Sequence, residues 1–363
     1  MGSFTAIPKA KGEANPDEDV AFPETSIPQL LARCRGELSG LPGPFQRSFR
    51  WNNNVVHKGK IRPSLRVLQW NQLSQTLGSQ NDGFVRCPLQ ALEWRTRRWR
   101  LLEELVRHQP DILCLQEVDF LIINPLLSLF NFSQFNLILP KPHPQVDHFP
   151  LLERALSSLG YDGHFVAKPD SPCIYLPYNS GPDGCALFYR RDQWEMVGQL
   201  QSRILEVWHV QSNQVAIAVN LRHLETQDEV CVATTHLKAR SGALLATLRN
   251  EQGKDLLAWL SAVKQHRPLI LTGDFNADPS EAVVRTIKEE LASAYPDSTP
   301  FTTWKIRETG EQKSTLDYIF HSGGIQASAT LDMPTEEQIG IDRLPSLAFP
   351  SDHLSMVADF QVL

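Results

Sequence analysis

Cysteine is scarce in this sequence of 363 residues, and its spacing fits neither a metal site nor a disulfide framework. No two of the six cysteines form a Cys-x-x-Cys pair, the spacing found in many zinc sites. We therefore expect no zinc and no disulfides, which suits a protein of a reducing compartment. The six residues are Cys34, Cys87, Cys114, Cys173, Cys185 and Cys231.

The sequence also lacks an excess of positive charge. It carries 35 Lys and Arg residues against 41 Asp and Glu residues, which gives a net charge of −6. Because neutralising many phosphates requires clustered Lys and Arg, this balance argues against an extended nucleic-acid footprint, and we expect no DNA partner. A small anionic substrate remains compatible with it, since such a substrate needs only a local pocket.

No segment has the features of a secretory signal or of a convincing membrane span. Residues 1–19 lack an apolar core and carry Lys, Glu and Asp. The uncharged run 120–139 is long enough to cross a membrane, but Asn124, Pro125 and Asn131 interrupt it, and polar side chains are costly in hydrocarbon. We interpret the run as a loop. We expect a cytoplasmic protein without a membrane partner, with a mitochondrial location as the alternative.

Composition divides the chain into two parts. Residues 1–60 are rich in Pro, Gly and polar residues, which is typical of a partly disordered leader. Residues 61–363 alternate short apolar strands with helical patterns, as expected for one catalytic domain. The dipeptide Val118-Asp119 recurs as Val146-Asp147, which indicates that a loop of unknown conformation, at about 120–147, is inserted in this domain.

One pattern occurs twice in the domain: an amphipathic helix, then a proline, a buried strand and an acidic residue. The first copy has a predicted helix over 89–108 and ends at Glu117, and the second has a helix over 243–265 and ends at Asp274. We infer two sheets that present their strand ends at one rim, where loops can carry chemistry.

The first of these helices carries four arginines beside two tryptophans. The cluster has two interpretations, a patch that binds nucleic acid or a solvated helix face, and we favour the solvated face. The four residues are Arg95, Arg97, Arg98 and Arg100.

Polar side chains lie where the predicted strands end. Taken alone, each has a plainer interpretation as a turn residue, a surface acid or a structural histidine. Their shared position at strand ends favours a single catalytic site, and the alternation of a strand puts Asp274 and Asn276 on one face. The set is Asn71, Glu117, His236, Asp274, Asn276, Asp317 and the pair Asp352-His353.

These residue types indicate metal-assisted attack on a phosphate. Oxygen ligands without cysteine point to Mg²⁺ or Mn²⁺. Glu117 is the expected principal ligand, with Asn71 and Asp352 as further ligands. The metal would neutralise the charge of the phosphate and polarise its phosphorus atom.

The remaining polar residues receive roles in the same reaction. Asp274 would orient or deprotonate the attacking water, and Asn276 would donate hydrogen bonds to the phosphate. His353, held in one tautomer by Asp317, would stabilise charge on the phosphoryl oxygens or transfer a proton.

Six short motifs, in this order along the chain, resemble the endonuclease/exonuclease/phosphatase family, which has the deoxyribonuclease I-like fold. The resemblance covers the chain from about residue 64 to its end and implies a four-layer α/β sandwich, two packed mixed β-sheets flanked by helices, with Mg²⁺ dependence. The motifs are Gln-Trp-Asn71, Leu-Gln-Glu117-Val-Asp, Thr-His236-Leu-Lys238, Gly-Asp274-Phe-Asn276, Thr-Leu-Asp317-Tyr and Ser-Asp352-His353.

Three further segments, Gly181–Ala186, Phe301–Arg307 and Glu336–Gly340, resemble a deadenylase-related branch of this family. That resemblance implies NADP⁺ and NADPH as substrates, with removal of their 2′-phosphate. Two alternatives stay open: a 3′ exoribonuclease that acts on poly(A), and an interaction protein without catalysis. The acidic chain offers no evident basic groove with stacking aromatic residues, so we place RNA second.

The same resemblance implies a set of substrate-binding residues. Lys168 and Arg240 would line the phosphate pocket together with His236 and Lys238, and Arg307 would reach the far end of the dinucleotide. For Lys168, which lies in Ala-Lys-Pro, the plainer alternative is a surface lysine.

Overall fold

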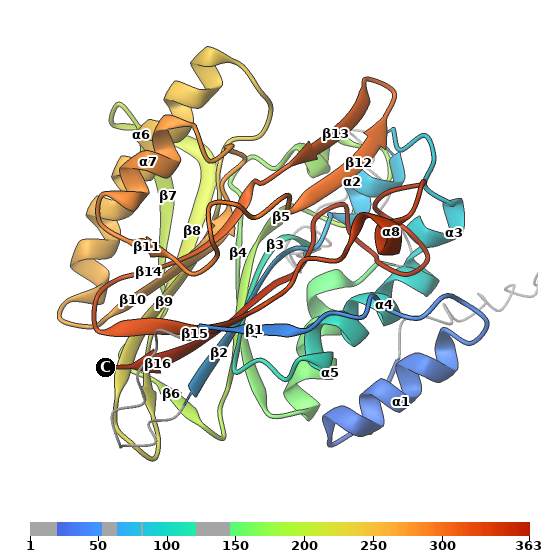
Figure 1. Ribbon diagram of the computed structural model, residues 1–363, viewed down its shortest axis with the longest axis horizontal. Helices are drawn as coiled ribbons and strands as arrows, with labels where there is room; N and C mark the ends of the chain where they lie inside the picture. The colour runs from blue at the N-terminus through green and yellow to red at the C-terminus, as the bar shows by residue number, and fades with distance from the viewer. Residues whose placement is uncertain (1–19, 53–63, 81–82, 121–145) are drawn as a thin grey trace, which may run out of the picture.

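The computed structural model describes residues 20–52, 64–80, 83–120 and 146–363. Two β-sheets pack face to face in the middle of the molecule, and helices cover the outer face of each sheet (Figure 1). This is the predicted four-layer α/β sandwich.

The first sheet has the strand order β1-β15-β16-β2-β3-β5-β4. Its central strands β2 and β3 run parallel, and both are buried over most of their length, as expected for strands covered on two faces. The bounds are β1 (Phe49–Trp51), β2 (Ser64–Asn71), β3 (Ile112–Asp119), β4 (Tyr161–Ala167), β5 (Asp183–Arg190), β15 (Ile325–Leu331) and β16 (Met356–Val362).

The second sheet has the order β11-β14-β10-β9-β8-β6, and β7 pairs with β8. A separate hairpin, β12 (Thr303–Arg307) and β13 (Gly310–Ser314), lies near the rim of the sandwich (Figure 1). The sheet consists of β6 (Trp194–Met196), β7 (Gln201–Val207), β8 (Val210–His223), β9 (Glu229–His236), β10 (Leu269–Asp274), β11 (Ala292–Ser293) and β14 (Asp317–His321).

Three apolar clusters hold the layers together. The middle cluster lies between the sheets and includes Val67, Cys114, Ile217 and Ile270. The helices α4 (Trp94–Arg107) and α5 (His148–Ser158) cover the first sheet, with α1 (Ile27–Glu37) against α4, and α6 (Ala243–Lys264) and α7 (Ala282–Lys288) cover the second. The short helices are α2 (Gln75–Gln80), α3 (Leu89–Leu92), η3 (Pro172–Tyr175) and α8 (Glu336–Ile339).

The two helix predictions differ in outcome. The helix predicted over 243–265 is confirmed as α6, which ends one residue earlier. The helix predicted over 89–108 is divided, because Glu93 has extended backbone and separates α3 from α4.

The favoured interpretation of the arginine cluster holds for Arg95, which is exposed, and was wrong for the other three residues. Arg97, Arg98 and Arg100 are 1%, 8% and 3% exposed, so they form neither a solvated face nor an open patch.

Part of the segment predicted as a leader packs on the domain. Leu30, Cys34 and Phe45 belong to the cluster that covers the first sheet, and β1 pairs with β15. Residues 1–19 and 53–63 lie outside the described residues, as do residues 121–145 of the predicted insertion. None of the helices in the described ranges has the length and apolarity that crossing a membrane requires.

Candidate active site

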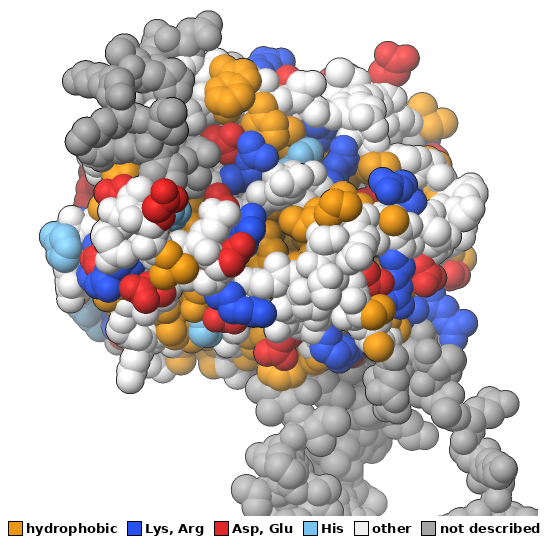
Figure 2. Space-filling view, turned by 90° about the horizontal axis from the view of Figure 1, so that it is seen from below, with side chains coloured by type: hydrophobic (Ala, Val, Ile, Leu, Met, Phe, Trp, Pro, Cys, Tyr) orange, Lys and Arg blue, Asp and Glu red, His pale blue; other side chains and the backbone are white. Residues whose placement is uncertain are grey.

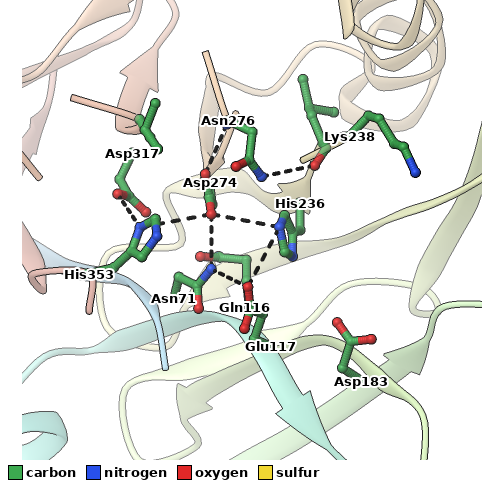
Figure 3. A network of polar contacts seen from close by, with 12 residues as sticks. Asn71, Gln116, Glu117, Asp183, His236, Lys238, Asp274, Asn276, Asp317 and His353 are labelled. Carbon is green, nitrogen blue, oxygen red and sulfur yellow. Dashed lines mark hydrogen bonds and ion pairs between the residues drawn. The ribbon is translucent and has the colours of Figure 1, made fainter. Parts of the chain in front are cut away.

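Asp274 lies at the centre of a polar cluster that both sheets build at one rim (Figure 3). β9 runs parallel to β10 and places His236 beside Asp274, while β14 runs antiparallel and places Asp317 opposite it. From the first sheet, Asn71 Nδ2 donates to Asp274 Oδ2 at 2.9 Å and to Glu117 Oε1 at the same distance. One amide therefore joins Asp274, the last residue of β10, to Glu117 near the end of β3.

A local irregularity aims the Glu117 carboxylate. The backbone of Glu117 has a φ of 54°, at a bulge where the register between β3 and β5 shifts. Bulges next to active sites commonly redirect a side chain. Glu117 Oε2 accepts a hydrogen bond from the backbone N–H of Ser74 at 3.1 Å, which fixes the carboxylate beside Asn71.

Asp274 is buried and meets a histidine on each side. Its Oδ2 lies 3.7 Å from His236 Nε2 and 3.8 Å from His353 Nδ1, and its Oδ1 accepts the backbone N–H of Asn276 at 2.9 Å. Burial raises the pKa of Asp274, with His353 as the largest opposing influence. A carboxylate with a raised pKa at such a site can take part in proton transfer.

His353 is charged at neutral pH. Its Nδ1 lies 2.8 Å from Asp317 Oδ2, and this oxygen also accepts the Thr302 hydroxyl at 2.6 Å. Burial disfavours the charged ring, but Asp317, Asp274 and Asp352 outweigh burial and raise the pKa of His353 to about 9. The ring is therefore an imidazolium next to Asp274, suited to stabilising negative charge.

His236 has the opposite character. Its Nδ1 lies 3.2 Å from Lys168 Nζ, and because an ammonium can only donate, Nδ1 accepts and Nε2 carries the proton. Burial and the charge of Lys168 lower the pKa of His236 to about 4. His236 is thus a neutral hydrogen-bond donor that faces Asp274 and Glu117.

Lys168 is a buried cation, so the interpretation as a surface lysine was wrong. It is 7% exposed, and its Nζ donates to Asp183 Oδ2 at 2.6 Å. Burial opposes its charge, but Asp183 and Glu117 outweigh burial and raise the pKa of Lys168. An ammonium is therefore held next to His236, within the polar cluster.

Lys238 and Arg240 follow His236 in the connection to α6. Within the described part of the chain, neither side chain has a hydrogen-bond or ion-pair partner. Asn276 lies two residues beyond the end of β10. Its side-chain amide donates one N–H to Leu237 O at 3.1 Å, and among the described residues its second amide N–H remains available for a ligand.

Asp352 lies in a different set of contacts from Glu117. It forms ion pairs with Lys305 and with Arg307, whose Nη2 lies 3.2 Å from Asp352 Oδ2. The Arg307 guanidinium also lies 5.0 Å from the centre of the Phe84 ring. Asp352 would act as a metal ligand only if it released these cations, and that role stays a prediction.

The residues around Asp274 fit a divalent cation. Ligand atoms of Glu117, His236 and Asp274 lie within 4.8 Å of one another, and a single neutral amide separates the two carboxylates. Hard oxygen donors of this kind suit a metal such as Mg²⁺. Asn71 faces the acids with its amide nitrogen, because its Oδ1 accepts the backbone N–H of Leu73 at 3.0 Å, so a ligand role for Asn71 requires the amide to turn.

Three residues of the site were missed by the sequence analysis. Asp183 holds Lys168, and Lys305 holds Asp352. Both lie inside segments that had been noted only for their resemblance, and the one available signal was a charged residue within an otherwise buried strand. The third is Arg97, a member of the cluster that was assigned to solvent.

Arg97 joins the loop that follows Asn71 to the loop that carries His353. Its guanidinium donates to the carbonyl oxygens of Gln72 and Leu73 at 2.7 Å each and to that of Pro350 at 3.1 Å. Four acceptors surround this buried side chain when the Gln75 side chain is included. Arg97 therefore fixes the spacing between the ends of two distant segments.

The chain is similar to known proteins of one enzyme family. Residues 68–353 match the model of the Endonuclease/Exonuclease/phosphatase family. Nocturnin of Drosophila melanogaster is 41% identical over the whole chain, which spans 60% of that relative's length, and nocturnin of Homo sapiens is 42% identical over 92% of the chain and 73% of its own length.

A solved structure of the human nocturnin catalytic domain, with a bound sulfate anion, is also similar. It matches 88% of this chain and 97% of its own with a TM-score of 0.64 and 36% identity. A more distant relative is the Ccr4 3′–5′ exoribonuclease subunit of Kluyveromyces lactis, 24% identical over 93% of this chain and 46% of its own length.

Proposed function

The chain belongs to the endonuclease/exonuclease/phosphatase family and, within it, to the nocturnins, and on that basis we propose that it removes the 2′-phosphate from NADP⁺ and NADPH. The products are NAD⁺ or NADH and inorganic phosphate. The observation that carries the proposal is Lys168, a buried ammonium held beside His236 and near the acids around Asp274. A buried cation next to β4, with two more cations in the connection that follows β9, suits one terminal phosphate.

Recognition of that phosphate is assigned to three cations. Lys168 is fixed by Asp183, whereas Lys238 and Arg240 have side chains that are unpaired among the described residues. An arginine guanidinium can donate two parallel hydrogen bonds to two phosphate oxygens, whereas a lysine ammonium acts as a point charge. Arg307, already beside the Phe84 ring, would contact the far end of the dinucleotide. The solved human nocturnin catalytic domain contains a bound sulfate, an anion similar in shape and charge to a phosphate group.

The chemistry is hydrolysis of a phosphate monoester. Glu117 would hold Mg²⁺, which neutralises phosphate charge and polarises the phosphorus atom. Asp274 orients the attacking water and accepts its proton, consistent with a raised pKa. His236 donates from Nε2, and the His353 imidazolium stabilises the charge on the phosphoryl oxygens. The bond between phosphorus and the 2′-oxygen breaks, the 2′-oxygen takes up a proton from solvent and leaves as a hydroxyl, and Asp274 returns its own proton to solvent.

The overall charge balance, 35 Lys and Arg residues against 41 Asp and Glu residues, favours a dinucleotide over RNA. On the face seen in Figure 2, basic and acidic side chains are intermingled and form no continuous basic stripe. Enzymes that hold single-stranded RNA combine a cationic groove with stacking aromatic residues. The relationship to Ccr4 keeps the exoribonuclease as the second candidate.

The deciding experiment supplies NADP⁺ and oligo(A) side by side to the purified full chain with Mg²⁺ at physiological salt. Inorganic phosphate and AMP are measured at equal enzyme concentration. We expect phosphate from NADP⁺ and little AMP from oligo(A). AMP release without phosphate from NADP⁺ would replace the proposal by the exoribonuclease, and the absence of both products would leave the interaction protein.

Replacing Lys168 with methionine tests the buried cation. Because the change removes a charge-assisted contact with the phosphate, we expect kcat/KM for NADP⁺ to fall roughly tenfold to hundredfold. The change also leaves Asp183 buried without its ion pair, so the control is the double variant Lys168→Met with Asp183→Asn. The double variant should recover thermal stability and stay impaired, whereas recovered activity would show that Lys168 acts only on the fold.

A further inference from the structure

One buried arginine of α6 binds the backbone of the connection between β9 and α6. Arg249 is 1% exposed, and its Nη1 donates to the carbonyl oxygens of Lys238 at 3.0 Å and of Arg240 at 2.7 Å. The side chains of these two residues have no hydrogen-bond or ion-pair partner among the described residues. A single buried group thus sets the path of the segment that carries both cations.

Arg249 is itself held by a carboxylate. Its Nε and Nη2 donate to Glu281 Oε2 at 3.1 and 2.7 Å, and Nη2 also lies 2.9 Å from Glu281 Oε1. Glu281 directly precedes α7. The planar guanidinium therefore uses one edge for the carboxylate and the remaining nitrogen for the two carbonyls, which a lysine cannot reproduce.

The backbone segment that Arg249 binds has an unfavourable conformation at Arg240. Arg240 has a φ of 76°, a left-handed value that residues with a side chain adopt rarely. Such strain persists where surrounding contacts over-determine it, and it is common at ligand-binding sites. A second residue of α6 also holds this segment, because Gln252 Oε1 accepts the backbone N–H of Lys238 at 3.1 Å.

We propose that Arg249 is a positioning residue that holds the backbone of Lys238 and Arg240 so that both side chains can bind a phosphate. This inference rests on the proposed function for the chemical class of ligand, a phosphate group. It adds a layer of specificity outside the site, because α6 and α7 together fix the phosphate-binding segment (Figure 1).

The test is a double-mutant cycle with Arg249→Lys and Arg240→Ala in the full chain. Arg249→Lys keeps the charge opposite Glu281 but cannot reach both carbonyls. Because small displacements of binding groups strongly affect rates, we expect Arg249→Lys to lower kcat/KM for NADP⁺ roughly tenfold to hundredfold, mainly through KM. In the Arg240→Ala background the same change should have a clearly smaller effect, because one of its targets is gone.

The matched control is Arg203→Lys. Arg203 forms a comparable two-pronged pair with Asp255 of the same helix but contacts no part of the 237–242 segment in the described structure. We expect Arg203→Lys to leave KM unchanged. If both variants lower the melting temperature and neither raises KM, or if the losses from Arg249→Lys and Arg240→Ala multiply fully, the positioning role is wrong.

Two measurements keep the result independent of folding and of the proposed function. Gln252→Met removes the acceptor for the Lys238 N–H with a smaller perturbation, and we expect a weaker rise of KM in the same direction. Binding of inorganic phosphate, measured by calorimetry, should weaken severalfold in Arg249→Lys and not in Arg203→Lys. If the wild-type protein does not hydrolyse NADP⁺, the proposed function fails. Weaker phosphate binding by Arg249→Lys than by Arg203→Lys would still support the positioning role of Arg249, and equal binding by the two variants would overturn it.

Discussion

Replacing Glu117 with alanine is expected to reduce phosphate release from NADP⁺ by roughly a thousandfold or more at saturating Mg²⁺, without unfolding the protein. The carboxylate accepts two hydrogen bonds, from the Asn71 amide and from the N–H of Ser74. Its contribution therefore lies in the charge that it provides beside Asp274. The measurement is the initial rate of phosphate release, with thermal denaturation of the same sample.

The control for this prediction is Glu229→Gln. Glu229 is a paired carboxylate of the second sheet, bound to Arg222 and Arg267 away from the site. We expect this variant to retain wild-type turnover. If the Glu117 variant also keeps near wild-type turnover at saturating Mg²⁺, Glu117 is not the residue that holds the metal.

Exchanging Asp317 for asparagine is expected to lower turnover by roughly two to four orders of magnitude while KM changes little. After burial, Asp317 is the largest influence on His353 and the main cause of its pKa of about 9. The amide can still accept a hydrogen bond, but it cannot stabilise an imidazolium. Since the charged ring is the active form, activity falls as pH rises through the pKa of His353.

The pH dependence of activity should shift in a defined direction in this variant. Removing the charge of Asp317 lowers the pKa of His353, so the alkaline decline of activity should move to lower pH in the variant. Asp359→Asn serves as the control, because Asp359 is a comparably buried carboxylate that pairs with Arg66 away from the site. An unchanged pH profile and turnover in Asp317→Asn would refute the pairing with His353.

Local pattern alone was sufficient to predict the strands that carry the site. β10 begins and ends where the apolar run between Pro268 and Phe275 indicated, because a short hydrophobic run with a following acid has one obvious assignment. The convergence of two sheets at one rim followed from repetition of the same pattern. The resemblance to a family added the sandwich and the proposed phosphate-binding residues, which spacing alone did not provide.

Long-range polar contacts could not be predicted from the sequence. Arg97 is 253 residues from Pro350, whose carbonyl it binds, and its neighbours in the sequence are also basic, so a solvated helix face was the natural interpretation. The ion pairs of Asp352 and of Lys168 likewise depend on which strands become neighbours in the sheets. A sequence pattern reports which face is buried, but not which charges meet there.

The most direct test of the account is hydrolysis of NADP⁺ by the purified chain in ¹⁸O-labelled water, with the products identified by mass spectrometry. We expect NAD⁺ without label and inorganic phosphate that carries one ¹⁸O atom, because water held by Asp274 attacks the phosphorus of the 2′-phosphate. Cleavage of the pyrophosphate bridge, or label in the 2′-hydroxyl of NAD⁺, would contradict it.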